Sequence, residues 1–255
     1  MFGRRSGGAH VLQEADPVGR NGEPNHQPGT EVLGAALSAP LAAIDRQQLL
    51  PGADELFRTI YTRARVGAFE TLAVCSSIAG EGKTSVSVGL AVTLAEDFPD
   101  RRVVVVETDL DRPVMARDFG MAPNPGLVDC LTGDQPIQVA CHTTLLDNLH
   151  VVLAGEPVRS PGRLLRSSRM AAAVDAIRQS YSIVILDVPP ILVNSDASLV
   201  ADLADGILLV VRAGVTPISL VHKAIEQLDE SRLRGVVLNG TESAVPGWLH
   251  RLCGL

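Results

Sequence analysis

The sequence predicts an α/β fold in which a mainly parallel sheet carries helices on both faces. Short runs of Val, Ile and Leu alternate with segments of helical periodicity, as in βαβ units. Hydrophobic residues make up 46% of the chain and aromatic residues only 3%, a composition that suits buried parallel strands. A glycine-rich loop ending in Gly82-Lys83-Thr84 follows the first apolar run and opens a helix. Together these observations predict a P-loop NTPase fold.

The 255 residues are expected to form one domain flanked by tails. Residues 1–30 are rich in Gly, Pro and polar residues, so they cannot bury enough apolar surface to order themselves. We expect a disordered tail there, a linker over 31–50, the P-loop domain over 51–242 and a short C-terminal tail over 243–255. One α/β domain of this size can bury a large core.

Each element of the domain is expected from its own pattern. Apolar runs bounded by turn signals predict the strands, which we place at 71–76, 103–107, 150–153, 182–187, 207–211 and 236–238. Helical spacing predicts helices at 54–64, 83–96 and 171–177, and short helices between 120 and 148. A further helix is expected to begin at Pro217 with Thr216 as its N-cap.

The glycine-rich loop is the strongest functional signal in the chain. Gly80 and Gly82 let backbone N–H groups approach phosphate oxygens closely. Lys83 can then reach the β- and γ-phosphates, and the Thr84 hydroxyl can ligate Mg²⁺ at the start of a helix. Ser77 stands where the usual pattern has its first glycine. The residues expected to bind nucleotide are Ala79, Gly80, Glu81, Gly82, Lys83, Thr84 and Ser85.

Two apolar strands end in carboxylates, as a magnesium-dependent phosphate site requires. The strand from Val103 leads into Glu107 and Asp109, and the strand from Ile183 leads into Asp187. Because the carboxyl ends of parallel strands meet at one edge of a sheet, these groups are expected beside the loop. Asp187 is expected to hold Mg²⁺ through water, with Asp109 as the second carboxylate. Glu107 is the candidate base for the proton of an attacking hydroxyl.

Composition excludes several other classes of protein. The net charge of −7 and the lack of a long basic run argue against a nucleic-acid partner. The longest apolar stretches are far too short to cross a bilayer, and the N-terminus lacks the apolar core of a secretory signal. We therefore expect a cytosolic protein without a membrane anchor of its own. Four scattered cysteines without Cys-x-x-Cys spacing are expected to be free thiols, namely Cys75, Cys130, Cys141 and Cys253.

The motifs taken in order resemble those of the bacterial tyrosine kinases of capsule and exopolysaccharide assembly, a family within the MinD/ParA-like group. The resemblance covers about residues 50 to 240. It is carried by these features: Ser-Ser-x-x-Gly-Glu-Gly-Lys-Thr at 76–84, Glu107-x-Asp-x-x-Arg-Pro, Asp187-Val-Pro-Pro, Asp196-Ala, Val211-Arg-Ala-Gly and Gly235-Val-Val-Leu-Asn239.

The resemblance implies an ATP- and Mg²⁺-dependent enzyme that phosphorylates protein tyrosine. It assigns catalysis to Lys83, Glu107 and Asp109, and metal binding to Thr84, Asp109 and Asp187. It also places Arg212 and Asn239 near the adenine of the nucleotide. The implied partner is a membrane-spanning chain-length regulator on a separate chain, which would hold the kinase at the inner face of the plasma membrane.

Three departures from the family pattern bear on function. The oligomerisation motif Glu-x-x-Arg-x-x-Arg is matched by Glu55 and Arg58 but has Tyr61 in its last position, so a homo-oligomer is left open. The acidic motif begins with Glu107 and has Asp111 where Arg is usual. Residues 240–255 contain no tyrosine, so a protein tyrosine substrate is expected in trans.

Two alternatives to a kinase are left open by the sequence. A MinD/ParA-type ATPase switch would use the same loop, although its members usually carry Lys where this chain has Ile78. A nucleotide-binding regulator of polysaccharide assembly without transfer activity would also fit the departures at Glu107 and Asp111.

Overall fold

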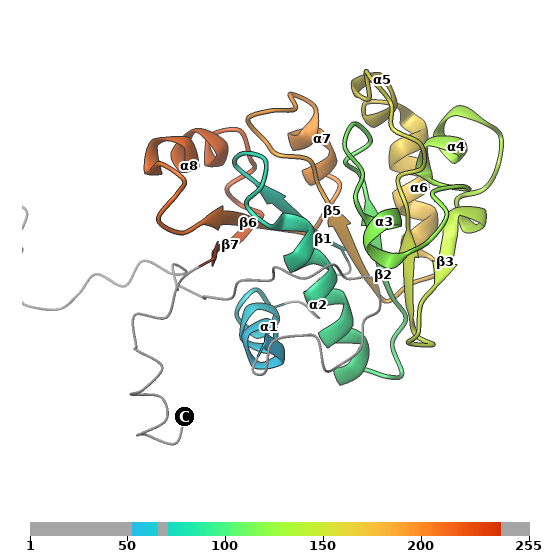
Figure 1. Ribbon diagram of the computed structural model, residues 1–255, viewed down its shortest axis with the longest axis horizontal. Helices are drawn as coiled ribbons and strands as arrows, with labels where there is room; N and C mark the ends of the chain where they lie inside the picture. Colours follow the sequence, from blue (N-terminus) through green and yellow to red (C-terminus); the bar gives the residue numbers. More distant parts are fainter. Residues whose placement is uncertain (1–52, 66–70, 241–255) are drawn as a thin grey trace, which may run out of the picture.

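The computed structural model describes residues 53–65 and 71–240, all within the domain expected over 51–242 (Figure 1). The tails expected at 1–30 and 243–255 and the linker expected at 31–50 lie outside the described residues.

The described residues form a seven-stranded sheet with the order β3-β4-β2-β5-β1-β6-β7. All neighbouring strands are parallel except β3, which runs antiparallel to β4. The strands are β1 (Thr71–Ser76), β2 (Val103–Glu107), β3 (Cys141–Thr143), β4 (Leu149–Val152), β5 (Ile183–Asp187), β6 (Gly206–Arg212) and β7 (Leu233–Asn239). The prediction of a mainly parallel sheet is confirmed.

Helices cover both faces of this sheet. The α-helices are α1 (Ala53–Arg63), α2 (Lys83–Asp97), α3 (Met115–Phe119), α4 (Leu127–Thr132), α5 (Gly162–Leu165), α6 (Ser168–Arg178), α7 (Ala197–Ala201) and α8 (Ile218–Ile225), with a 3₁₀ helix η1 at Ile137–Ala140. In Figure 1, α1 lies beside α2, and α4, α5 and α6 are grouped together. This is the layered architecture that buried parallel strands require.

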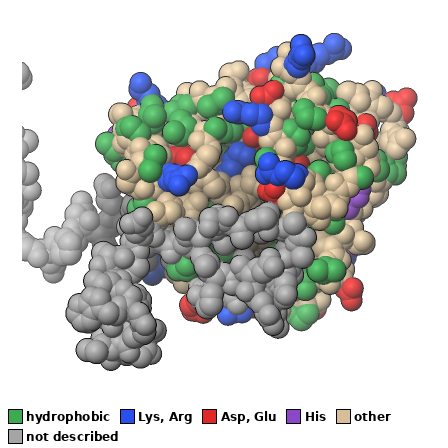
Figure 2. All heavy atoms as spheres, in the orientation of Figure 1, with side chains coloured by type: hydrophobic (Ala, Val, Ile, Leu, Met, Phe, Trp, Pro, Cys, Tyr) green, Lys and Arg blue, Asp and Glu red, His purple; other side chains and the backbone are tan. Residues whose placement is uncertain are grey.

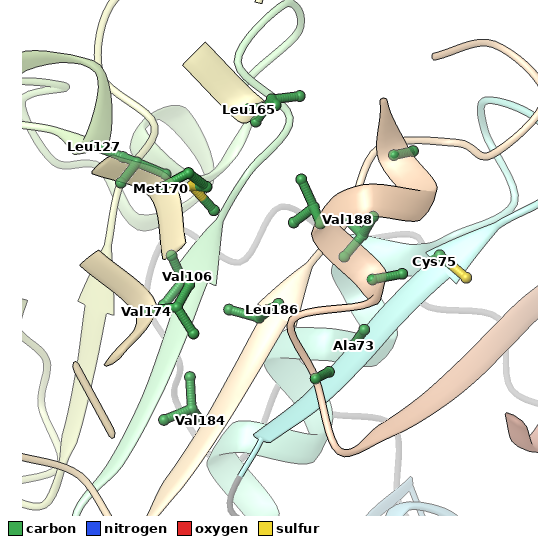
Figure 3. Close-up of a cluster of buried hydrophobic side chains, with 14 of the residues drawn as sticks. Ala73, Cys75, Val106, Leu127, Leu165, Met170, Val174, Val184, Leu186 and Val188 are labelled. Atoms are coloured by element: carbon green, nitrogen blue, oxygen red, sulfur yellow. The ribbon is translucent and has the colours of Figure 1, made fainter. Parts of the chain in front are cut away.

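Alternate residues of each central strand enter two separate cores. Leu72 and Val74 face α1 and α2, whereas Ala73 and Cys75 face the helices from α4 to α8. Figure 3 shows the second core, where Val106 and Leu186 of neighbouring strands lie close to the helix α6 side chains. All residues of β1, β2 and β5 are buried, so the strand tips that carry the site rest on a closely packed base.

The helix α2 is apolar almost all round, as expected, and is buried from Val86 to Ala95. It packs closely on α1, since a Cβ added at Gly89 would lie 2.1 Å from the Phe57 ring. Only glycine lets α1 approach at this point.

The structure adds to and corrects the expected elements. The predicted strands and main helices are present with small shifts at their ends, whereas β3, α3, α5 and α7 were not expected. The predicted N-cap role of Thr216 is wrong. Pro217 stands at the N-cap with no side-chain bond to the helix, because the Thr216 hydroxyl donates to Glu81 instead. Cys75, Cys130 and Cys141 are free thiols as expected, and Cys253 lies outside the described residues.

No helix within residues 53–65 and 71–240 is both long and apolar enough to cross a bilayer.

Candidate functional site

The P-loop occupies the carboxyl edge of the sheet, between β1 and α2. Gly80 and Gly82 both have left-handed backbone conformations, with φ of 83° and 90°. Open space surrounds the position of a Cβ at Gly80, whereas a Cβ at Gly82 would lie 2.0 Å from Asn239 Nδ2. Both glycines are therefore required, one for its conformation and one also for the close approach of β7.

The Glu81 carboxylate is buried and stabilises the P-loop through hydrogen bonds. Its Oε2 accepts the Ile78 N–H at 2.7 Å, while Oε1 accepts the Thr216 hydroxyl and the Arg212 N–H. Both carboxylate oxygens of Glu81 already accept hydrogen bonds from the protein. The nucleotide contact expected of Glu81 would therefore have to come from its main chain. The sequence did not reveal this role, although an acidic residue inside an anion-binding loop is itself unusual and calls for internal donors.

Lys83 lies in a nearly closed cluster of oxygen atoms at the start of α2. Its Nζ is 3.2 Å from Asp109 Oδ2, 3.7 Å from Asp187 Oδ2 and 3.4 Å from the Thr84 hydroxyl. Burial opposes the charge of the ammonium group, but Asp187 and Asp109 outweigh it, so the pKa of Lys83 is raised. Lys83 therefore carries its positive charge at neutral pH.

Asp187 is held by hydroxyl groups of α2 on both of its oxygens. Thr84 donates to Oδ2 at 2.7 Å, and the Ser87 hydroxyl lies 3.0 Å from Oδ1. The Thr108 hydroxyl donates to the Asp187 carbonyl oxygen at 2.8 Å, which fixes the tips of β2 and β5 side by side. Ser87 and Thr108 were missed by sequence reasoning. The position of Ser87 four residues after Lys83, on the same face of the helix, is the signal that could have revealed it.

Glu107, the base expected from the sequence, is fully buried, and its carboxylate accepts backbone N–H groups. Its Oε1 accepts the N–H groups of Val114 and Met115 at 2.6 and 2.8 Å, and Oε2 accepts the Ala154 N–H at 3.1 Å. Burial raises its pKa, and the three N–H donors counteract part of this effect. The carboxylate thus fixes the start of α3 and the end of β4, which is a structural role.

Arg212 and Asn239, expected near adenine, are neighbours on β6 and β7 and both reach the P-loop. They face each other in the β6–β7 register. Arg212 donates to the Gly80 carbonyl oxygen at 3.4 Å, and Asn239 Nδ2 donates to the Glu81 carbonyl oxygen at 2.9 Å. The described structure therefore brings the loop and the ends of the last two strands together.

A cavity of about 230 Å³ is lined in part by Asp109. Its walls come from the segment after β2, the loop before α5 and the segment after β5. The lining residues are Asp109, Asp111, Arg112, Arg159, Pro161, Gly162, Pro189, Pro190, Val193, Asn194, Ser195 and Asp196. Figure 2 shows basic and acidic side chains interspersed among apolar ones over the described part of the face in view. Asp109 thus links the P-loop to this cavity, because it contacts Lys83 and also lines the cavity.

Similarity to known proteins was found in sequence and in structure, although no protein-family model matches the chain. The putative tyrosine-protein kinase EpsB of Ralstonia nicotianae is 32% identical over 165 residues, which is 64% of this chain and 22% of EpsB. The chain therefore spans less than a quarter of that relative.

A second relative is matched over most of its length. The tyrosine-protein kinase CpsD of Streptococcus agalactiae serotype III is 30% identical over 198 residues, covering 75% of this chain and 84% of CpsD. Among solved structures, the chimerical protein CapA2B2 superposes with a TM-score of 0.74 at 25% identity, covering 84% of this chain and 95% of that one. By its P-loop, its sheet order and its likeness to CpsD, the chain belongs to the family of bacterial tyrosine-protein kinases.

Proposed function

We propose that this protein is an ATP-dependent protein-tyrosine kinase of capsular or exopolysaccharide biosynthesis, which transfers the γ-phosphoryl group of ATP to a tyrosine hydroxyl. The observation that carries the proposal is the Lys83 ammonium, which Asp109 and Asp187 hold at the start of α2 directly after the P-loop. A fixed positive charge at this point stabilises the charge on a phosphoryl group during transfer.

The residues of the site fit a nucleotide with Mg²⁺. Gly80 leaves the space that backbone N–H groups need to approach phosphate oxygens, since no atom lies near its Cβ position. Thr84, Asp187 and Asp109 offer the hard oxygen ligands that Mg²⁺ prefers. Within the described ranges no group of three or more His, Cys, Asp or Glu residues could hold a metal by itself. Mg²⁺ would therefore be shared with the phosphates, whose negative charge it would neutralise.

Asp109 is the residue we propose to orient the acceptor hydroxyl and take up its proton. Its side chain is 10% exposed, lines the cavity beside the loop and lies 3.2 Å from Lys83. We assign this role to Asp109 in preference to Glu107, because both oxygens of Glu107 accept backbone N–H groups. The 3.2 Å contact with Lys83 would hold the Asp109 carboxylate in place beside the P-loop.

The acceptor tyrosine is proposed to lie on another protein chain. The only two tyrosines of the sequence are Tyr61 and Tyr181. Tyr61 donates its hydroxyl to Asp97, and the buried Tyr181 ring packs against His150 and Arg102. Neither tyrosine is free to enter the site of its own chain.

The activating partner is proposed to be a membrane-spanning chain-length regulator on a separate polypeptide. It would hold the kinase at the cytoplasmic face of the membrane. CpsD supports a separate polypeptide, because this chain matches 84% of CpsD but only 22% of EpsB. The proposal allows the kinase to form a homo-oligomer.

The test is to incubate the full chain with γ-labelled ATP, Mg²⁺ and a tyrosine-containing acceptor, and to follow phosphotyrosine and free phosphate together. Phosphotyrosine that is lost in Lys83→Met supports the kinase. Free phosphate without phosphoryl transfer to tyrosine would instead indicate an ATPase switch, provided that the result is the same with and without the partner's cytosolic segment. Neither product under both conditions would indicate a nucleotide-binding regulator.

A further inference from the structure

We propose that the cavity beside Asp109 holds the acceptor tyrosine, and that Arg159 selects acceptors with an acidic residue next to that tyrosine. This inference rests on the proposed kinase function and adds a sequence preference to it.

The cavity is part of the rigid frame of the phosphate site. The Val158 N–H donates to the Leu110 carbonyl oxygen at 2.8 Å, which ties the Arg159 loop to the segment after β2. The Ile191 N–H donates to the Ser76 carbonyl oxygen at 2.8 Å, which ties the opposite wall to the start of the P-loop. A group in the cavity therefore has a fixed position relative to the loop, as a transfer reaction requires.

The lining suits the side chain of tyrosine. Pro161, Pro189, Pro190 and Val193 offer apolar surface to an aromatic ring, and Asp109 lies at the end nearest Lys83. The volume of about 230 Å³ is smaller than a typical pocket for a drug-sized ligand. A single phenol ring with its hydroxyl at Asp109 matches this combination of size and polarity.

The charges of the lining leave one cation without a partner. Asp109 pairs with Lys83, Asp111 lies 3.7 Å from Arg112, and Asp196 accepts from Arg166 at 2.6 Å. Arg159 makes no ion pair with any residue in 53–65 or 71–240, and its side chain is exposed at the rim.

Asp196 is not free to neutralise Arg159. It is buried, and a Cβ added at Gly162 would lie 2.1 Å from its Oδ2, so the carboxylate is pressed against the backbone of α5. Its bond to Arg166 holds it there. An acidic residue on the incoming acceptor would form an ion pair with Arg159. This charge complementarity favours acceptor sequences that carry Asp or Glu beside the tyrosine.

The experiment compares two peptides that differ only in having Glu or Gln on both sides of one tyrosine. The full chain is assayed for kcat and KM toward each peptide, and peptide binding is measured separately by fluorescence anisotropy. We expect kcat/KM to be roughly fivefold higher for the Glu peptide, because a partly exposed ion pair lowers its KM by about that factor. The preference should weaken as salt is raised.

Charge reversal identifies the residue responsible. In Arg159→Glu the preference should disappear or pass to a peptide with Lys beside the tyrosine, while acceptor-independent ATP hydrolysis is unchanged. Arg163→Glu is the matched control, because Arg163 is exposed on α5 and does not line the cavity. It should retain the preference for Glu.

The outcomes separate the two proposals. Equal binding and transfer for the Glu and Gln peptides, or a preference that survives in Arg159→Glu, would overturn the selectivity while the kinase function stands. If wild type hydrolyses ATP but transfers phosphate to no peptide even with the partner's cytosolic segment present, the kinase function fails and the selectivity fails with it.

Discussion

Tyr61 donates its hydroxyl to Asp97 across 2.6 Å and thereby joins α1 to the C-terminal end of α2. Arg58 reaches the same carboxylate through Nε at 2.8 Å and Nη2 at 2.7 Å. Arg58, which matches the second position of the family's oligomerisation motif, and Tyr61, which replaces its last Arg, are thus both bound within their own chain. An oligomer that used Arg58 would have to break or share this contact.

The first prediction concerns the stability of this contact. Asp97→Asn should lower the free energy of unfolding by about 1–2 kcal/mol, because the amide replaces one of the two oxygens that accept from Arg58 and Tyr61. Urea denaturation measures the loss. Asp100→Asn is the control, since Asp100 lies three residues away and is exposed. A loss of equal size in both variants would contradict the assignment.

The second prediction concerns acid pH. The Arg58 guanidinium holds the pKa of Asp97 below its ordinary value, so the unfolded chain binds the proton more readily than the folded chain. The stabilisation is fully present above the unfolded pKa of about 4 and is lost as pH falls through the folded value. The difference in unfolding free energy between wild type and Asp97→Asn should therefore shrink as the pH is lowered below about 4. A difference independent of pH would show that packing, not charge, is responsible.

At alkaline pH the contact between Tyr61 and Asp97 should be lost when the Tyr61 hydroxyl loses its proton. Burial, followed by the bond to Asp97, raises the pKa of Tyr61 to about 12. The contribution of Tyr61 to stability is complete below its unfolded pKa of about 10 and is lost as pH rises through the folded value. Ultraviolet titration of the tyrosinate band in Tyr181→Phe would report Tyr61 alone, and an ordinary value near 10 would exclude the bond in solution.

The third prediction is that nucleotide affinity depends on Thr216, which does not itself lie in the P-loop. Thr216→Val removes a donor from the buried Glu81 carboxylate and so loosens the loop. We expect ATP to bind roughly tenfold more weakly, because the loop must then be ordered on binding. Binding of a fluorescent ATP analogue measures this, with the exposed Ser219→Ala on α8 as control. Unchanged affinity would mean that Glu81 holds the loop without Thr216.

The fourth prediction separates a structural carboxylate from a catalytic one. In Glu107→Gln the amide NH₂ would face a backbone N–H donor. The free energy of unfolding should therefore fall by about 1–3 kcal/mol. The pH dependence of kcat should keep its shape, because Glu107 takes no proton from the acceptor. Loss of the acid limb of that profile would restore Glu107 as the base.

The fifth prediction is the counterpart at Asp109. Asp109→Asn should lower phosphotyrosine formation by about 10²- to 10⁴-fold, the usual contribution of a positioned base. Nucleotide affinity should stay within about one order of magnitude, since Lys83 keeps Asp187 as its partner. A loss confined to nucleotide affinity would assign Asp109 to metal binding alone.

The fold was largely predictable because the strands of this chain are buried on both faces and appear in the sequence as uninterrupted apolar runs. The strand from Thr71 to Ser76 has the predicted bounds. The short β3 was missed because Cys141–Thr143 is partly exposed and carries no such run. Thr216 was assigned to a helix cap because the buried acceptor that competes for its hydroxyl lies 135 residues away in the sequence.

The candidate site was predictable in its membership but not in the direction of its side chains. Strand ends and loop spacing brought Lys83, Asp109 and Asp187 together correctly, since parallel strands share one carboxyl edge. The same argument could not tell that Glu107 turns toward the backbone N–H groups of α3 while Asp109, two residues later, turns toward Lys83. That choice depends on where α3 begins, which is set by tertiary packing. The roles assigned to these residues stay predictions.

The bond from Asn239 to the Glu81 carbonyl oxygen spans 158 residues of sequence. During synthesis the ribosome would complete the P-loop long before it adds the residue that fills the space beside Gly82. The nascent chain must therefore emerge almost to the end of the domain before its phosphate loop acquires its final support, and ATP binding would report the completion of folding.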